Sequence, residues 1–215
     1  GKSEEAIQYF NEALSLDPDH ADAHLNRCFI YLKTNKIREG LNDFEWRWRS
    51  KEFKSKARIF SKPVWDGHKH LKGKTILIWG EQGPQDMIIW SSCLPYLKEL
   101  SCHCILECSE KLLPLFSRSF PDVHVRVQNE DETNEPNDFD FHLPMGSLFK
   151  YFMPQIFQKT TSKPFLMVDP LKVKKWRERL KSLGRGPYVG ISWKSPVVTP
   201  LRSQNYTKIS DWEPV

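Results

Sequence analysis

The stretch KTILIWGEQGPQD, residues 74–86, constrains the fold of this 215-residue chain more than any other. An unbroken apolar run that starts at Ile76 leads into a polar turn, which contains Gly83 and ends at Asp86. Such a run is typical of a strand buried on both faces. Apolar residues at helical spacing come next, so the turn joins a strand to a helix. Ligands of open α/β sheets bind beyond the carboxyl ends of strands, and residues 81–86 are therefore the first place to look for chemistry.

From Lys74 onward, strand-like and helix-like patterns alternate. Strands are predicted at residues 74–79, 102–108, 122–127, 139–143 and 187–193, and helices at 86–100, 110–118, 146–152 and 170–183. The last helix is the clearest, with Asp169 as N-cap, Pro170 at its first position and Gly184 as its stop. We interpret its many basic residues as the solvated side of an amphipathic helix, with contact to anionic lipid or phosphate as the alternative. The alternation predicts an α/β fold with a Rossmann-like, doubly wound parallel sheet.

An internal repeat precedes this region. Ala6, Ile7 and Phe10 recur 34 residues later as Gly40, Leu41 and Phe44. A period of 34 residues with small and aromatic residues at these positions resembles the tetratricopeptide repeat. In the second copy Arg47 replaces a small residue and Trp48 replaces a leucine. This departure predicts a last repeat that docks on the part of the chain after it.

These patterns divide the chain into four segments. We expect tetratricopeptide repeats at 1–49, a linker at 50–73, a Rossmann-like domain at 74–186 and the start of a truncated further domain at 187–215. Phe60, Val64 and Trp65 of the basic linker are predicted to pack against the Rossmann-like domain, and its Lys/Arg run is interpreted as a solvated face.

Composition excludes several classes of protein. The formal net charge of +5 is compatible with an anionic ligand but too small to indicate a nucleic-acid partner. No apolar run is long enough to span a bilayer, and no signal-peptide pattern opens the chain, so we expect a cytoplasmic protein without a transmembrane segment. Peripheral association with the inner membrane is left open.

Three of the five cysteines stand close together in CHCILEC, with His103 between them. Their spacing fits no common zinc pattern, and residues 102, 104 and 108 would lie on one face of a strand. We interpret them as buried free thiols and expect no metal site. The Asp138-Phe-Asp140 triplet has the spacing of a metal motif but lies inside a predicted strand.

Several polar residues come directly after strands of the predicted sheet and should meet at one edge. They are Gln82 and Asp86 after the first strand, Ser109 after the second, His142 after FDF, and Lys194 and Ser195 after GISW. A carboxylate in this position is a helix cap in one reading and a general base for an acceptor hydroxyl in the other. The histidine is either structural, or it orients a substrate or shares the proton transfer.

The order of these motifs suggests a family. GLNDFEWRWRS, KPVWDG, LKGKTILIWGEQGPQD, LPYL, ILEC, FDFHLPMGSL and VGISWKS together resemble bacterial proteins that fuse tetratricopeptide repeats to a heptosyltransferase-like glycosyltransferase domain of the GT-B type, similar to glycosyltransferase family 9. The resemblance covers nearly the whole chain. It implies that residues 74–186 are the acceptor-side half of a GT-B fold and that VGISWKS opens the donor-binding half.

The resemblance also implies site residues. Asp86 matches the catalytic base of such enzymes, Glu81, Gln82, Gly83 and His142 would contact substrate, and Lys194 and Arg202 would meet the donor phosphates. In the family the segment reads Glu-Gln-Gly-Leu-Gly-Asp, so Pro84 and Gln85 replace a leucine and a glycine that permits a tight turn. Most of the donor half is missing, and we expect this chain alone not to transfer sugar.

The sequence therefore predicts a metal-independent, inverting glycosyltransferase in the full-length protein. It would move a sugar from a nucleotide-sugar donor, without a further cofactor, to a hydroxyl on a glycan, lipid or protein, and the repeats would recruit the acceptor or a protein partner. The alternative is a non-catalytic interaction scaffold with a degenerate transferase domain.

Overall fold

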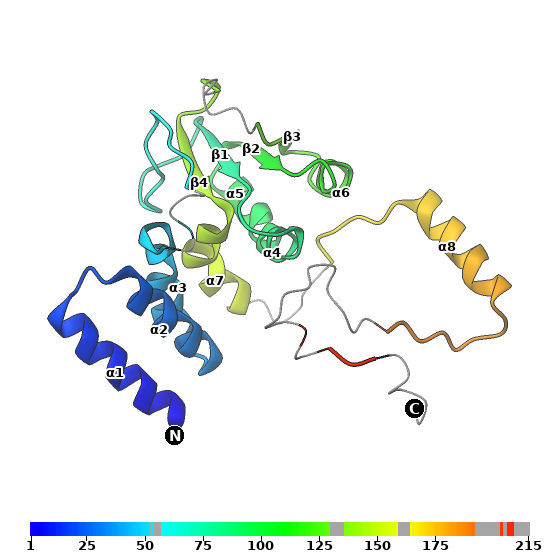
Figure 1. Cartoon of the computed structure of the whole chain (residues 1–215). Helices are drawn as coiled ribbons and strands as arrows, with labels where there is room; N and C mark the ends of the chain where they lie inside the picture. Colours follow the sequence, from blue (N-terminus) through cyan, green and yellow to red (C-terminus); the bar gives the residue numbers. More distant parts are fainter. Residues whose placement is uncertain are drawn as a thin grey trace. The chain divides into compact units, whose positions relative to one another are not determined.

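The computed structural model describes residues 1–51, 53, 57–129, 136–158, 164–191, 203 and 206–208. Contacts divide the chain into two compact units, Gly1–Met167 and Val168–Val215, and each is described by itself. The first unit contains helical hairpins and a parallel sheet (Figure 1).

The first unit begins with helices α1 (Lys2–Leu16), α2 (Ala21–Lys33) and α3 (Ile37–Phe44), followed by the 3₁₀ helix η1 (Glu45–Arg49). We call α1 through η1 the repeat module. The helices bury one apolar stripe each, which includes Ile7 and Leu14 of α1 and Leu41 of α3. A Cβ atom on Gly40 would lie 2.8 Å from Leu32 Cδ2, so the small residue of the repeat pattern lets α3 approach α2 closely. The hairpins predicted from the repeat are confirmed.

Four parallel strands come next in the chain, in the sheet order β3-β2-β1-β4. They are β1 (Thr75–Trp79), β2 (His103–Cys108), β3 (His124–Val127) and β4 (Phe141–Pro144). Ile78 of β1 lies between Leu106 of β2 and Leu143 of β4. All three side chains are buried, as expected for central strands of a parallel sheet. The first four predicted strands are confirmed within two residues at each end.

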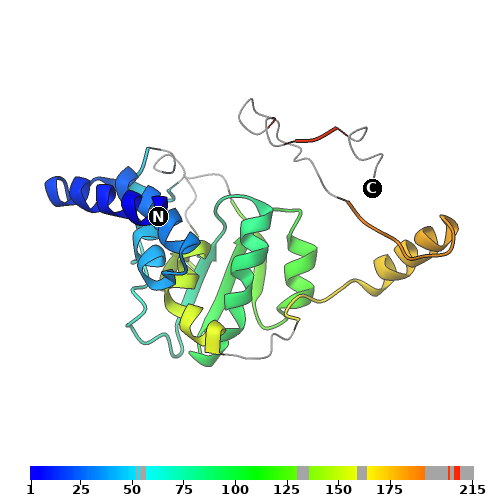
Figure 2. The same ribbon diagram turned by 90° about the horizontal axis from the view of Figure 1, so that it is seen from below.

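Helices cover one face of this sheet (Figure 2). They are α4 (Pro84–Trp90), the 3₁₀ turn η3 (Ser91–Cys93), α5 (Leu94–Glu99), α6 (Leu113–Ser119), the 3₁₀ turn η4 (Met145–Ser147) and α7 (Leu148–Gln158). Their apolar side chains form one core with Ile76 and Ile78 of β1 and with Cys104 and Cys108 of β2. The cysteines are free thiols, and Cys104 and Cys108 are buried on the same face, as predicted.

The opposite face corrects the prediction of a doubly wound sheet. Leu77 and Ile105 point to this face and pack with Phe139 and with Phe60 of the linker, not with a helix. Trp65 of the linker enters the main core, and Val64 forms an isolated parallel bridge with His142 at the outer edge of β4. The reason lies in the connection from β3 to β4, because none of its described residues is helical. The linker covers the face in its place.

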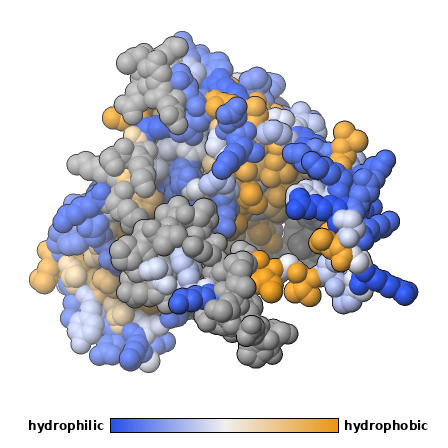
Figure 3. Space-filling view, turned by 45° about the vertical axis from the view of Figure 1, so that its right-hand side comes forward, coloured by the Kyte–Doolittle hydropathy of each residue, from blue (hydrophilic) through white to orange (hydrophobic). Residues whose placement is uncertain are grey.

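The second unit contains α8 (Pro170–Ser182). Asp169 accepts hydrogen bonds from the backbone N–H groups of Leu171 and Lys172 at 3.0 and 3.2 Å, and this cap confirms the predicted start. Apolar residues of α8 are exposed between the basic ones (Figure 3). Trp176 is 53% exposed. Residues 187–191 are not a strand, and the rest of the strand predicted at 187–193 lies outside the described residues. Within the described part of the chain, no helix is both long and apolar enough to cross a membrane.

Candidate functional site

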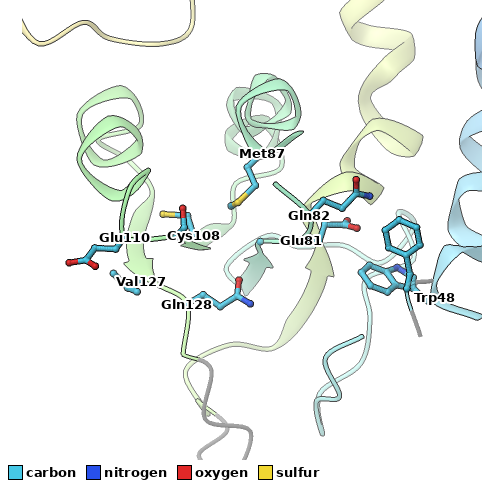
Figure 4. Close-up of a pocket in the computed structure, with 11 residues that line it drawn as sticks. Trp48, Glu81, Gln82, Met87, Cys108, Glu110, Val127 and Gln128 are labelled. Carbon is cyan, nitrogen blue, oxygen red and sulfur yellow. The ribbon is translucent and has the colours of Figure 1, made fainter. Parts of the chain in front are cut away.

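The carboxyl ends of β1, β2 and β3 border a cleft of about 500 Å³. The strands contribute Gly80, Glu81 and Gln82 after β1, Cys108, Ser109 and Glu110 around the end of β2, and Val127 and Gln128 around the end of β3. Met87 of α4, Trp48 of η1 and Phe53 complete the lining. Trp48 lies on the side of the cleft opposite Glu110 and Val127 (Figure 4). The repeat module therefore supplies one wall of a cleft whose other walls are strand ends.

A buried ion pair joins the repeat module to this edge of the sheet. Arg47 is fully buried, and its Nε and Nη2 donate to Glu81 Oε2 and Oε1 at 2.9 and 2.8 Å. The N–H of Gly146 donates to Glu81 Oε1 at 2.7 Å, and Arg47 also donates to Ser147 Oγ at 2.9 Å. Ser147 in turn donates to the Glu45 carboxylate at 2.9 Å. The predicted docking of the last repeat is confirmed, and Glu81 uses both carboxylate oxygens for it.

The turn after β1 has its left-handed residue at Gln82, with φ +57°. Gln82 is exposed and lines the cleft. Gly83 is extended and precedes α4, and Pro84 is the first helical residue, where its missing N–H is not needed. The helix thus begins two residues earlier than predicted. Pro84 and Gln85 are accommodated because the left-handed conformation falls before them.

Asp86 lies in the first turn of α4 and is half-buried. Its Oδ2 accepts the backbone N–H of Gly83 at 3.2 Å. The capping role considered for this carboxylate is therefore present in the structure. Asp86 is not among the residues that line the cleft, although its neighbour Met87 is.

His142 lies within β4 and not after a strand, so the prediction that it reaches the sheet edge is wrong. β4 runs from Phe141 to Pro144, and His142 pairs with Leu77 inside it. The ring is buried on the linker face, 4.5 Å from the Phe60 ring between centroids, and its Nδ1 accepts the indole N–H of Trp79 at 3.2 Å. The structure brings Gln82 and Ser109 together at the cleft and keeps His142 away from it.

Cys108 and Ser109 lie where the second strand runs into the cleft. Burial raises the pKa of the Cys108 thiol from its ordinary value of 9.0 to about 11. The thiol is therefore protonated at neutral pH, and it lacks the thiolate character that a cysteine nucleophile needs.

A second buried carboxylate lies on the linker face of the sheet. Glu107 of β2 is 1% exposed and forms ion pairs with Arg58 of the linker and with Arg126 of β3, the latter at 2.8 Å. Arg126 also pairs with Asp138 at 2.5 Å. Asp140 accepts the Thr75 N–H at 2.9 Å, and this hydrogen bond lowers the pKa of the Asp140 carboxyl. The Asp138-Phe-Asp140 triplet thus has structural partners.

Sequence reasoning missed Trp48 as part of the cleft and Arg47 as the buried partner of Glu81. The signal was present, since both residues break the repeat pattern in the second copy. Lys194 and Arg202, predicted to meet donor phosphates, lie outside the described residues. Among residues that the structure describes, no group of three or more His, Cys, Asp or Glu side chains is placed to hold a metal ion.

Comparison with known proteins supports the tetratricopeptide repeat predicted at the start of the chain. Residues 1–35 match the family described as TPR repeat. Protein FlbA of Caulobacter vibrioides (strain ATCC 19089 / CIP 103742 / CB 15) is 28% identical over 266 residues, an alignment that covers 100% of this chain and 44% of FlbA. The chain thus spans less than half the length of this relative. No solved structure matches the chain. A TPR repeat is therefore present at the N-terminal end of a chain with a bacterial relative.

Proposed function

We propose that this chain is the repeat-bearing, acceptor-side part of a GT-B glycosyltransferase similar to heptosyltransferases. The full-length protein would transfer a sugar from a nucleotide-sugar donor to a hydroxyl group of a glycan, lipid or protein. One observation carries the proposal: the repeat module and three strand ends build the same cleft. A ligand or partner held by the repeats would lie directly beside the edge where parallel α/β sheets bind their ligands.

In this proposal Asp86 takes the proton from the acceptor hydroxyl. It stands at the first turn of the helix after β1, next to cleft residue Met87. Gln82, on the exposed turn, would contact the acceptor, and Glu81 would hold the turn in place through Arg47. Gly83 would position the base, since its backbone N–H donates a hydrogen bond to the Asp86 carboxylate.

The test is sugar transfer by the full-length protein, with nucleotide sugars as donors, compared with Asp86→Asn. An asparagine oxygen still accepts the Gly83 N–H, so the helix cap is kept while the base is removed. We expect a loss of roughly 10²- to 10⁴-fold in kcat, the usual contribution of a general base. Asp122→Asn is the matched control, because Asp122 is exposed and pairs only with Lys98 among the described contacts. Equal activity of Asp86→Asn and the unaltered protein would remove Asp86 as the base.

A second function is favoured by the hydrogen bond between Asp86 and Gly83. The carboxylate is engaged in a cap and lies outside the cleft lining, which fits a scaffold whose transferase domain no longer acts. The TPR repeat itself suggests binding of a protein partner. If the full-length protein binds no nucleotide sugar in calorimetry, the scaffold is the better assignment.

A further inference from the structure

Trp48 is the residue that links the repeat module to the cleft most directly. Its side chain is half-buried and lines the cleft. The ring is held by its neighbours, since the Arg47 guanidinium carbon lies 4.5 Å from its centroid and the Trp79 ring centroid lies 5.2 Å away. The indole N–H is buried and has no hydrogen-bond partner within the part of the chain described. The part of Trp48 that the cleft can use is therefore its apolar ring surface.

Most polar groups that line the cleft with Trp48 are uncharged or charge-balanced, and the exception is Glu110. Gln82 and Gln128 contribute carboxamides and Ser109 a hydroxyl. The charge of Glu81 is balanced by Arg47 at 2.8 Å. Glu110 also borders the cleft, and its carboxylate points away from Trp48 (Figure 4). Lysine and arginine are absent from the cleft lining formed by the described residues.

These groups select a class of ligand. A carboxamide and a hydroxyl can each donate and accept hydrogen bonds, and a sugar hydroxyl has the same two capacities. A phosphate only accepts and finds no cation in the lining described. A flat ring surface beside a few polar groups is also the usual composition of a small-ligand site. An uncharged sugar, with an apolar C–H face and hydroxyl edges, matches both features.

We infer that Trp48 is a ligand-binding residue of the cleft and that its ring packs against an uncharged sugar ring. Gln82 and Gln128 hydrogen-bond the hydroxyls of that sugar. The inference rests on the proposed function for the meaning of the site as an acceptor site. It adds that the repeat module contributes to the chemistry of sugar recognition and not only to recruitment.

The test is equilibrium binding to the full-length protein without any nucleotide sugar. Methyl glucoside and N-acetylglucosamine are the neutral probes, glucose 6-phosphate is the anionic probe and uridine is the nucleobase probe, each followed by ligand-observed NMR. We expect the neutral sugars to bind and glucose 6-phosphate and uridine to bind at least several-fold more weakly. Tighter binding of the phosphate sugar or of uridine, or binding of no sugar, would overturn the inference.

Two substitutions separate ring packing from simple bulk. Trp48→Phe keeps an aromatic ring, and Trp48→Leu keeps an apolar side chain without one. Aromatic packing predicts that the leucine variant binds the neutral sugar roughly five- to tenfold more weakly than the phenylalanine variant. Trp46→Phe is the matched control, because Trp46 stacks on His24 in the repeat module and does not line the cleft. Equal affinities of the phenylalanine and leucine variants would overturn the assignment, provided thermal unfolding shows both are folded.

The outcome can be told apart from that of the transfer assay. Sugar binding that depends on the Trp48 ring, together with no transfer, would leave the inference standing and remove the proposed enzyme. If sugar is transferred and the acceptor KM is unchanged in Trp48→Leu, the proposed enzyme would stand and the inference about Trp48 would be overturned.

Discussion

Arg47 and Glu81 form a doubly hydrogen-bonded ion pair that is sealed inside the protein, with the arginine 0% and the glutamate 7% exposed. One residue lies at the end of the repeat module and the other just after β1. Burying two charges is costly unless the geometry is good and the remaining polar atoms are satisfied. Here Gly146 donates to Glu81, and Arg47 also donates to Ser147, to the Phe44 carbonyl and to the Glu45 carboxylate. The pair therefore fixes the orientation of the repeats at the sheet edge.

Removing one partner of this pair should destabilise the first unit strongly. In Arg47→Ala, Glu81 would stay buried without a counter-charge, and we expect the free energy of unfolding to fall by about 3–5 kcal/mol. Urea unfolding followed by circular dichroism measures this loss. Arg49→Ala is the control, since the Arg49–Asp19 pair is exposed and its loss should cost less than about 1 kcal/mol. Similar losses in the two variants would show that the buried pair does not hold the repeats.

Gly146 should not tolerate a side chain. A Cβ atom there would lie 2.7 Å from Glu81 Oε1 and 3.1 Å from both Phe44 and Trp90. Gly146→Ala should lower the free energy of unfolding by about 1–3 kcal/mol, as overpacking does in other cores. Gly190→Ala, where nothing lies within 4 Å of the added atom, should change it little. Crystallography of the alanine variant should show Glu81 displaced, and an unmoved Glu81 at full stability would contradict the packing described here.

Phe60 should anchor the linker on the sheet. Its ring contacts the rings of Trp79, Phe139 and His142, at centroid distances of 6.2, 5.6 and 4.5 Å. Truncation in Phe60→Ala should cost about 3 kcal/mol of unfolding free energy, at the low end for a core phenylalanine because the side chain is only partly buried.

The neighbouring residue offers a control for this substitution. Ile59 is 94% exposed, so Ile59→Ala should stay within about 0.5 kcal/mol of the unaltered protein. Hydrogen exchange of the β1 amides should rise in the phenylalanine variant and not in the isoleucine variant. Equal protection in both would mean that the linker does not seal this face.

Stability should decline in alkali because of the buried thiols. Burial raises the pKa of Cys108 from 9.0 to about 11 and that of Cys28 to about 12. Above pH 9 the unfolded chain loses these protons while the native protein keeps them, so the native state binds more protons and the free energy of unfolding falls as the pH rises from about 9 to 11. Urea titrations at pH 8, 9 and 10 measure the slope. Cys108→Ala should make it shallower, and an unchanged slope would assign the decline to other groups.

The sequence predicted those features of the fold that depend on neighbouring residues in the chain. The run from Ile76 to Trp79 predicted β1 because a strand buried on both faces shows in its own residues. The cap at Asp169 likewise needs only its neighbours. The linker-covered face could not be predicted, because it depends on which segment reaches Leu77 and Ile105 in three dimensions.

The candidate site shows the same division. The turn at Gln82 and the approach of Ser109 result from strand ends in a parallel sheet, and the sequence predicted both. His142 was misplaced because it was counted as following the apolar run Phe139–Phe141, whereas β4 begins at Phe141 and includes His142. The partner of Arg47 could not be named, since Glu81 is 34 residues away and meets it only after both elements have packed.

The buried Arg47–Glu81 pair between the repeat module and the sheet sets the distance between the repeat helices and the cleft. Arg47 holds Glu81 through two hydrogen bonds, α2 packs on η1, and α1 packs on α2, so the arrangement sets the distance from the repeat helices to the cleft. A partner bound along those helices would place one segment of its own chain at the strand ends. If it bound one helical turn further along, it would place a different segment there. Which position of the partner reaches the cleft would then depend on its distance from the segment bound by the repeats, as well as on the chemistry of the cleft.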